Sequence, residues 1–382
     1  MRLLYVALDQ TVPGTLGGSI HVQSVAEGLA ALGHDVHVAT RPGGAWPAGA
    51  VTWHAMAPPF GRSELRWMRA GAIADLARRV GAELVMERYY NFGGEGVLAA
   101  ARIGVPAVLE VNAPVIDYPG SAKARLDRAL IVEPMRRWRD RICRQTDLFI
   151  TTSAEILPPW VERRRILEVE WGADVDHFHP GAVGPLPFAR DPNRILCVFA
   201  GAFRSWHGVV HLSAALARLH QAGDTRFGAV FIGDGPERAS AERVARDVPG
   251  VTFTGFLPHT TLPAALAAAD IGVAPFDPIK HAPLRLGFYW SPLKVFEYMA
   301  VGLPVVAPAL PRLKRLVEDG HEGVLYSPKD PRGLDQALVA LADAPTRKRM
   351  GTAARARVVR DYSWRAHCAV LDKRLRAVRR AR

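Results

Sequence analysis

The feature that most constrains the fold is an alternation of short apolar segments and helical patterns that runs through the chain twice. In the first half, helical patterns near 20–32, 63–80, 93–103 and 121–145 separate segments rich in branched residues. Those segments read as strands: LLYVAL, DVHVAT, VTWHAM, ELVMER, PAVLEV and LFITTS. The second half repeats the alternation with RILCVFAG, FGAVFIG, VTFTG, IGVAPF, PVVAP and GVLYS. Such a pattern predicts an α/β fold in which helices cover both faces of parallel sheets.

The break between the halves predicts the domain organisation. HPGAVGPLPFARDPN is rich in Pro and Gly and has no periodicity, as expected of a linker. A chain of 382 residues suits two domains. We expect a Rossmann-like domain over 1–180, a linker over 181–193, a second Rossmann-like domain over 194–365, and a basic final helix over 366–382. Two doubly wound domains would face each other across a cleft and bind ligands beyond the carboxyl ends of their strands.

The composition indicates the class of protein and its cellular environment. Hydrophobic residues make up 49% of the chain and charged residues 23%, as in globular enzymes. Cys143, Cys197 and Cys368 are isolated, which favours a reduced, cytoplasmic environment. The apolar run before Asp9 is too short for a signal peptide, and no uncharged apolar run reaches membrane-spanning length.

The net charge of +12 is unevenly distributed. Residues 1–180 hold 20 Lys and Arg against 20 Asp and Glu, whereas residues 347–382 hold 13 against two. Eight basic residues also lie in KARLDRALIVEPMRRWRDRICRQTD. Both segments allow a solvated helix face, or attachment to the anionic inner face of a membrane. Nucleic acid is not expected as a partner, since no zinc, helix-turn-helix or RNA-recognition pattern accompanies the charge.

The segment FYWSPLKVFEYMAVGLPVVAP carries the most specific chemistry. Ser291 is a good helix N-cap, and Pro292 suits the first helical position. Gly302 would end the helix before a buried strand. Free N–H groups at the helix start, together with the charge of Lys294, predict an anion site. Glu297 lies further along, where a carboxylate accepts hydrogen bonds from hydroxyls, so a diphosphate between a sugar and a ribose would suit the segment.

In its S-P-x-K-x-x-E-Y-M-A-x-G-x-P-V-V-A form, this segment resembles the donor-binding signature of the retaining, two-domain glycosyltransferases of family 4. Further motifs follow in family order over nearly the whole chain: GGSIHVQSVAEGLAALGHDVHVAT, WGADVDHFHP, FAGAFRSWHG, FIGDGPE, VTFTGFLP and YSW. The resemblance implies the GT-B fold, a last helix that crosses back onto the N-terminal domain, and sugar transfer from a nucleoside diphosphate sugar to a hydroxyl acceptor with retention of configuration.

The resemblance also implies roles for residues of the second domain. Ser291, Leu293 and Lys294 would bind the diphosphate, and Glu297 the ribose hydroxyls. A departure lies eight positions before Glu297, where many relatives carry an acid that holds the donor sugar and this chain has Tyr289. The identity of the sugar is therefore open.

A second departure concerns the FAGAFRSWHG loop, in which relatives place an Arg and a Lys against the diphosphate. Phe203 and His207 occupy those two positions, and Arg204, one place along, is the candidate substitute. His207 is either a phosphate contact or a neutral structural histidine. Gly208 from this loop and Gly233 from FIGDGPE complete the expected donor-binding set.

In the first domain, Gly17 and Gly18 would permit positive φ and close approach to a ligand, with Ser19 capping the next helix, although a plain glycine turn is equally compatible. Asn112 ends a strand where relatives often place a His near the donor sugar. We therefore assign catalytic roles to Asn112, Arg204 and Lys294.

Glu87 and Arg88 end another strand, and either line the acceptor side or pair with each other. The Asp-x-Asp sequence Asp174-Val175-Asp176 fits an interdomain turn rather than a metal motif, so transfer without a metal is predicted, and no cofactor is expected beyond the nucleotide sugar. The acceptor is open between a glycan, a lipid-linked molecule and a small molecule. A sugar-nucleotide epimerase, a phosphorylase and a surface-binding protein remain as alternatives, and a nicotinamide dehydrogenase lacks its glycine fingerprint.

Overall fold

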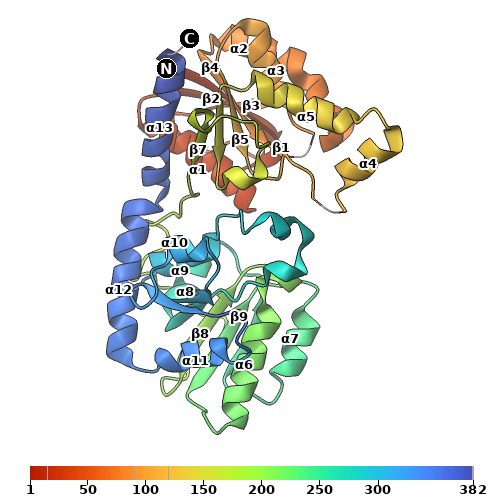
Figure 1. Ribbon diagram of the computed structural model, residues 1–382. Coiled ribbons are helices and arrows are strands. Elements are labelled where there is room, and N and C mark those ends of the chain that lie inside the picture. The colour runs from red at the N-terminus through yellow and green to blue at the C-terminus, as the bar shows by residue number, and fades with distance from the viewer. Residues whose placement is uncertain (15, 91, 119, 381–382) are drawn as a thin grey trace. The chain divides into compact units, whose positions relative to one another are not determined.

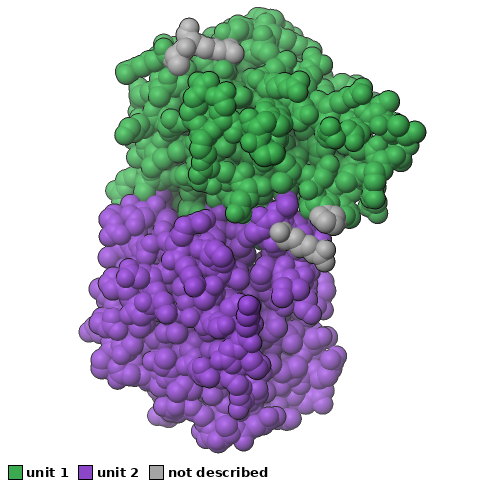
Figure 2. Space-filling view, in the orientation of Figure 1, with its two compact units in different colours: residues 1–172, 289–291, 364–382 green, residues 173–288, 292–363 purple. Residues whose placement is uncertain are grey.

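The computed structural model describes residues 1–14, 16–90, 92–118 and 120–380. The chain forms two compact units, coloured separately in Figure 2. Unit 1 comprises residues 1–172, 289–291 and 364–382, and unit 2 comprises residues 173–288 and 292–363. Each unit therefore draws on segments that are distant in sequence, and the last helix belongs to the unit that contains the N-terminus.

Unit 1 is built on a seven-stranded parallel sheet with the strand order β3-β2-β1-β4-β5-β6-β7. Its central strands are almost wholly buried, which explains their continuous apolar sequences. The strand bounds are β1 Arg2–Val12, β2 Asp35–Pro42, β3 Thr52–Ala55, β4 Leu84–Tyr89, β5 Ala107–Val111, β6 Leu148–Thr151 and β7 Ile166–Glu168. Because the strand order reverses beside β1, the point between β1 and β4 is where a doubly wound sheet binds its ligand.

Helices cover both faces of this sheet (Figure 1). They are α1 Gly17–Ala31, α2 Ala70–Val80, α3 Glu95–Ile103, α4 Ala122–Leu130, α5 Pro134–Gln145 and α13 Trp364–Arg380. Leu371 and Leu375 of α13 are buried in the same apolar cluster as Val22 and Val25 of α1. The last helix is thus part of the core of unit 1.

Unit 2 repeats the plan with a six-stranded parallel sheet of order β10-β9-β8-β11-β12-β13. Its strands are β8 Ile195–Ala200, β9 Phe227–Ile232, β10 Val251–Gly255, β11 Ile271–Val273, β12 Val305–Pro308 and β13 Gly323–Tyr326. Its helices are α6 Val209–Gln221, α7 Arg238–Val244, α8 Leu262–Ala267, α9 Leu293–Ala300, α10 Leu313–Leu316, α11 Gly333–Ala340 and α12 Ala344–Asp361. The predicted α/β class, with two doubly wound parallel sheets, is confirmed.

Two local expectations were wrong. The helix expected over 121–145 is broken into α4 and α5, because Ile131 and Glu133 have φ values of 58° and 48° ahead of Pro134. A proline cannot continue a helix and disfavours helical geometry in the residue before it. The strand β7 was missed, since it is only three residues long. Among the described residues, no helix combines the length and the apolar character needed to cross a membrane.

Candidate functional site

In unit 2 the strand order reverses between β8 and β11, so the loops that leave these two strands border the expected ligand site. The first loop, 201–208, leads into α6, and the second, 274–292, leads into α9. Most of the residues that the sequence assigned to the donor lie on these loops and on the first turn of α9.

Lys294, in the first turn of α9, has the least satisfied charge in this region. Its side chain is only 9% exposed, and among the described residues its Nζ has no hydrogen-bond partner. The ammonium lies 3.9 Å from the centroid of the Phe199 ring and 5.4 Å from that of Phe276. Burial lowers the pKa of Lys294 to about 7, although Glu297 opposes the shift. A buried cation without a partner is unfavourable unless an anion completes it.

The two rings beside Lys294 escaped the sequence analysis. Phe199 is the residue before the last of β8, and Phe276 follows β11, so both look like ordinary core aromatics in the sequence. Only the meeting of the two strands brings the rings to the ammonium, where their π faces attract the charge while excluding water. A Cβ on Gly201 would lie 3.1 Å from Lys294 Nζ, so glycine there leaves room for the ammonium beside the backbone.

Glu297 lies one turn beyond Lys294 on the same helix, and is half-buried. Burial raises the pKa of Glu297 to about 7, while the charge of Lys294 opposes that change. Among the described residues, the N–H groups of Leu293 and Lys294 have no partner, as is normal at a helix start. The free N–H groups at the helix start and the ammonium of Lys294 can bind an anion. The carboxylate of Glu297, one turn further along, can accept hydrogen bonds from hydroxyl groups of the same ligand.

The expectation that Ser291 caps α9 was wrong. Its Oγ donates to Glu170 Oε2 at 2.7 Å and accepts from the N–H of Trp171 at 2.9 Å, so the hydroxyl is not available to the helix. Pro292 occupies the cap position, without a side-chain hydrogen bond. Tyr289, at the position of the usual acid, is buried in unit 1 and supplies no carboxylate.

His207 is held as a neutral imidazole. Its Nδ1 donates to the carbonyl oxygen of Ala202 at 2.6 Å, and burial together with the nearby Lys294 lowers its pKa to about 3. Only Nε2 therefore remains for a ligand, as an acceptor from a hydroxyl unless a bound anion restores a proton. Gly208 follows with φ 74°, and a Cβ there would lie 1.7 Å from the carbonyl oxygen of Pro275.

Three other predicted positions have different environments. Arg204 is exposed, with its guanidinium 6.0 Å from the Trp206 ring centroid, so it does not join the buried group around Lys294. Phe203 is fully buried in the core, which explains why it supplies no charge. Gly233 has φ 132°, and a Cβ there would come within 2.0 Å of the carbonyl oxygen of Gly201, so it allows the first loop to pass close to β9.

In unit 1 the corresponding reversal point lies between β1 and β4. Gly17 begins α1, with Leu16 as the cap residue, so the prediction that Ser19 caps this helix was wrong. Gly18 does not have positive φ; it is needed for close packing, because a Cβ would lie 2.3 Å from Gln10 Oε1 and 3.2 Å from Arg88 Nη2. Gly18 therefore lets the start of α1 lie against the end of β1 and beside Arg88.

Glu87 and Arg88 do not pair with each other. The carboxylate of Glu87 is fully buried and accepts from the N–H groups of Gly94, Gly96 and Val97 at the start of α3, at 2.5, 2.8 and 3.1 Å. Burial, reinforced by nearby Glu95, raises the pKa of Glu87. Arg88 instead forms an ion pair with Asp9. The ends of β1 and β4 thus carry a buried network of charges, and Arg88 of this network lies beside Gly18 in the first turn of α1.

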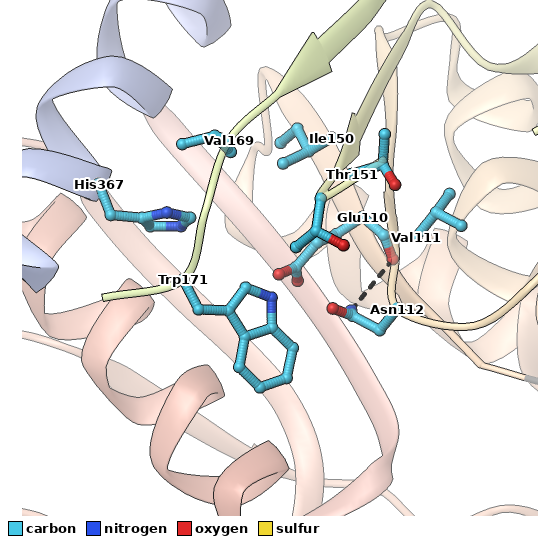
Figure 3. A pocket seen from close by; sticks show the side chains of 9 residues that line it. Glu110, Val111, Asn112, Ile150, Thr151, Val169, Trp171 and His367 are labelled. Carbon is cyan, nitrogen blue, oxygen red and sulfur yellow. Dashed lines mark hydrogen bonds between the residues drawn. The ribbon is translucent and has the colours of Figure 1, made fainter. Parts of the chain in front are cut away.

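Asn112 follows β5 beside a narrow pocket at the ends of β5 and β6 (Figure 3). The Asn112 amide donates to the Glu110 carbonyl oxygen at 3.4 Å, and the Glu110 side chain extends toward Trp171. Burial would raise the pKa of Glu110, but His21 and its hydrogen bond lower it to about 2. The lining residues are Glu110, Val111, Asn112, Ile150, Thr151, Thr152, Val169, Trp171 and His367.

Among the described residues, one group has side chains close enough together to hold a metal ion, namely Glu318, His321 and Glu322. Glu322 already accepts from Arg357 at 2.9 Å and from the N–H of Glu318 at 2.6 Å. The group precedes β13, at the amino end of the sheet, whereas ligands bind at the carboxyl end. We assign it a structural role.

Comparison with known protein families identifies both halves of the chain. Residues 16–166 match the family model described as Glycosyltransferase Family 4, and residues 194–344 match the model described as Glycosyl transferases group 1. The MMP alpha-(1->4)-mannosyltransferase of Mycolicibacterium hassiacum is 31% identical over 291 residues, which cover 72% of this chain and 66% of that protein, just under two thirds.

Solved structures share the fold over the whole length. Sucrose-phosphate synthase from Thermosynechococcus elongatus superimposes with a TM-score of 0.72 at 20% identity and covers 100% of both chains. HepE from Anabaena, solved in complex with UDP-glucose, has a TM-score of 0.68 at 15% identity and covers 99% of this chain and 100% of its own. Both likenesses support the fold described above.

Proposed function

We propose that this chain, a glycosyltransferase of the GT-B fold with a family 4 domain followed by a group 1 domain, transfers a sugar from a nucleoside diphosphate sugar to a hydroxyl acceptor with retention of configuration. The observation that carries the proposal is the unpartnered ammonium of Lys294 at the reversal point of the sheet in unit 2. The UDP-glucose bound by HepE supports a nucleotide-sugar donor.

The proposed chemistry follows from the charge that develops as the sugar departs. The leaving diphosphate gains negative charge, and preorganised cations and N–H groups stabilise that charge most strongly where water is excluded. Lys294 and the free N–H groups at the start of α9 would supply this stabilisation. Glu297 would accept hydrogen bonds from the ribose, and neutral His207 would accept from a hydroxyl through Nε2.

The first test of this proposal is binding. We expect thermal shift with a panel of nucleoside diphosphates and their sugars to reveal one preferred base, because a ligand that binds only the folded state raises the melting temperature. Substitution of Glu297 by Ala should weaken that ligand by about tenfold or more, since hydrogen bonds to a charged group stabilise by roughly 1.5–3 kcal/mol. Unchanged affinity would refute the ribose role. Mixing the preferred sugar nucleotide with and without an acceptor separates transfer from epimerisation, which needs no acceptor.

The lowered pKa of Lys294 predicts how donor affinity depends on pH. Above pH 7 the free protein holds this amine neutral, so binding an anion must take up a proton. The dissociation constant should therefore rise by up to about tenfold per pH unit above pH 7. Below pH 7, protonation of Glu297 should weaken the ribose contact instead. Lys294→Arg is the matched control, because a guanidinium keeps its charge throughout this range. A flat titration by calorimetry for the native protein would contradict the assignment of the anion site.

The same proposal covers the acceptor and the metal requirement. We infer that transfer needs no divalent metal, since the one Asp-x-Asp sequence, Asp174-Val175-Asp176, forms a turn in which Asp174 Oδ1 accepts from the N–H groups of Asp176 and His177. Treatment with EDTA should therefore leave the rate unchanged. We also infer that the acceptor is presented at an anionic membrane surface. The support is α5, whose exposed residues Arg137, Arg141 and Arg144 lie one turn apart on one helix face. Of the predicted acceptor contacts, Arg88 lies beside the start of α1, whereas Glu87 is engaged by α3.

A further inference from the structure

The connection between α4 and α5 presents branched apolar side chains to solvent. Leu130 is 50% exposed, Ile131 87% and Val132 55%, and Leu126, one turn earlier on α4, is 39% exposed. Scattered exposed apolar residues are common, but contiguous ones mark an interaction surface. We call Leu126, Leu130, Ile131 and Val132 the apolar tip. In Figure 1, α4 lies at the outer edge of unit 1.

This exposure is fixed by the surrounding structure. Asp127 of α4 accepts from the N–H groups of Met135 and Arg136 at 2.6 and 2.9 Å, and so caps the start of α5. Arg139 of α5 donates to both carboxylate oxygens of Asp117, at 2.5 and 2.9 Å, and reaches Asp127 at 3.4 Å. These bonds tie the two helices together and hold the ends of the connection between them in place.

The backbone of the apolar tip is also unusual. Ile131 has φ 58°, in the left-handed region that branched residues rarely adopt. Strain of this kind persists where the surroundings over-determine it, and often where it serves a function. Here the hydrogen bonds of Asp127 over-determine the connection, and the result is an isoleucine directed to solvent.

Positive charge accompanies the apolar tip on both helices. Arg125 and Arg128 of α4 are exposed, and so are Arg136 and Arg137 in the first turn of α5. Of these, Arg136 is paired with Glu133 at 2.9 Å. Apolar side chains ringed by arginines match a bilayer with anionic headgroups, which offers hydrocarbon below and negative charge at the surface.

We propose that the apolar tip inserts into the headgroup region of an anionic membrane while the arginines of α4 and α5 contact the phosphates. Charge complementarity selects a lipid surface over a second copy of this chain, because both copies would bring the same positive ring to the contact. The inference deepens the proposed membrane presentation of the acceptor by naming the residues that enter the bilayer. It does not depend on the donor chemistry.

The first experiment is co-sedimentation of the full chain with vesicles of phosphatidylcholine alone or mixed with phosphatidylglycerol, at physiological salt and without any sugar nucleotide. We expect binding to the anionic vesicles only. Ile131→Asp should weaken it by about tenfold or more, since a carboxylate there both removes the apolar contact and faces negative lipid. Val183→Asp is the matched control, because Val183 is 92% exposed in unit 2 and should leave binding unchanged.

The second experiment distinguishes insertion from surface attraction. Ile131→Cys can be labelled selectively with the fluorophore NBD, because Cys143, Cys197 and Cys368 are all buried. Insertion should shift the NBD emission to the blue and strengthen it on anionic vesicles. Sedimentation without this shift would overturn the inference in favour of purely electrostatic attachment. A dimer in solution that Ile131→Asp dissociates would overturn it in favour of self-association. In either case, unchanged transfer to a soluble acceptor would leave the proposed glycosyl transfer standing.

Discussion

Substitution of Lys294 by Met lowers kcat/KM for sugar transfer by roughly 100- to 1000-fold, the loss typical of removing one donor from a preorganised anion site. The unliganded protein should nevertheless become more stable, by about 1–3 kcal/mol, because the substitution removes a buried polar group that has no partner. Met fits the same apolar surroundings of Phe199 and Phe276. Steady-state kinetics and chemical denaturation at pH 7 measure the two effects.

Misfolding would lower both the activity and the stability, whereas this prediction expects the activity to fall and the stability to rise. Lys314→Met is the control, since Lys314 is exposed on α10 and its replacement should change neither quantity appreciably. If Lys294→Met lost stability together with activity, the ammonium would have a structural partner, and the anion site would be wrongly assigned.

Substitution of Gly208 by Ala should lower kcat/KM by roughly 100-fold, because ångström-scale displacement of a catalytic loop has effects of that size. The added Cβ would lie 1.7 Å from the carbonyl oxygen of Pro275, which is backbone and cannot rotate away. Either the 201–208 loop or the 274–292 loop must move, and these are the loops that surround Lys294. The left-handed φ of 74° adds about 1–2 kcal/mol of strain.

Gly223, at the other end of α6, provides the comparison. It also has positive φ, 86°, but no atom lies within 4 Å of the position that its Cβ would take. Gly223→Ala should therefore show the loss of stability without the loss of activity. Equal losses of activity in both variants would mean that strain alone, rather than displacement of the loops, governs the site. Denaturation and kinetics on the pair decide between the two.

The sequence predicted the paired sheets well because their strands are local patterns of apolar residues. Motif and backbone coincide for Lys294 and Glu297 at the start of α9, and their roles in donor binding stay predictions. Ser291 shows where local rules fail: a good cap residue forms its bonds with Glu170 and Trp171, about 120 positions away in sequence. Such long-range partners cannot be read from propensity.

Glu87 and Arg88 show the same limit of local sequence rules. Neighbours on a strand point to opposite faces, so a pair of adjacent opposite charges should have been expected to find separate partners. Glu87 contacts the start of α3, and Arg88 contacts Asp9. The signal was present in the alternation of the strand, whereas the identity of each partner depended on tertiary packing. The partner of Glu87 is the start of α3, and that of Arg88 is Asp9 on β1, 79 positions earlier in the chain.

The place of α13 has a consequence for how the protein is made. Leu371 and Leu375 complete the apolar core of unit 1, and Asp372 bonds to His34 at 2.5 Å. During synthesis the segments of the first lobe leave the ribosome early, yet this core stays open until the final helix emerges, after all of the second lobe. The lobe that is translated first therefore completes its core last. A truncated product without the final helix would expose apolar surface to chaperones and proteases.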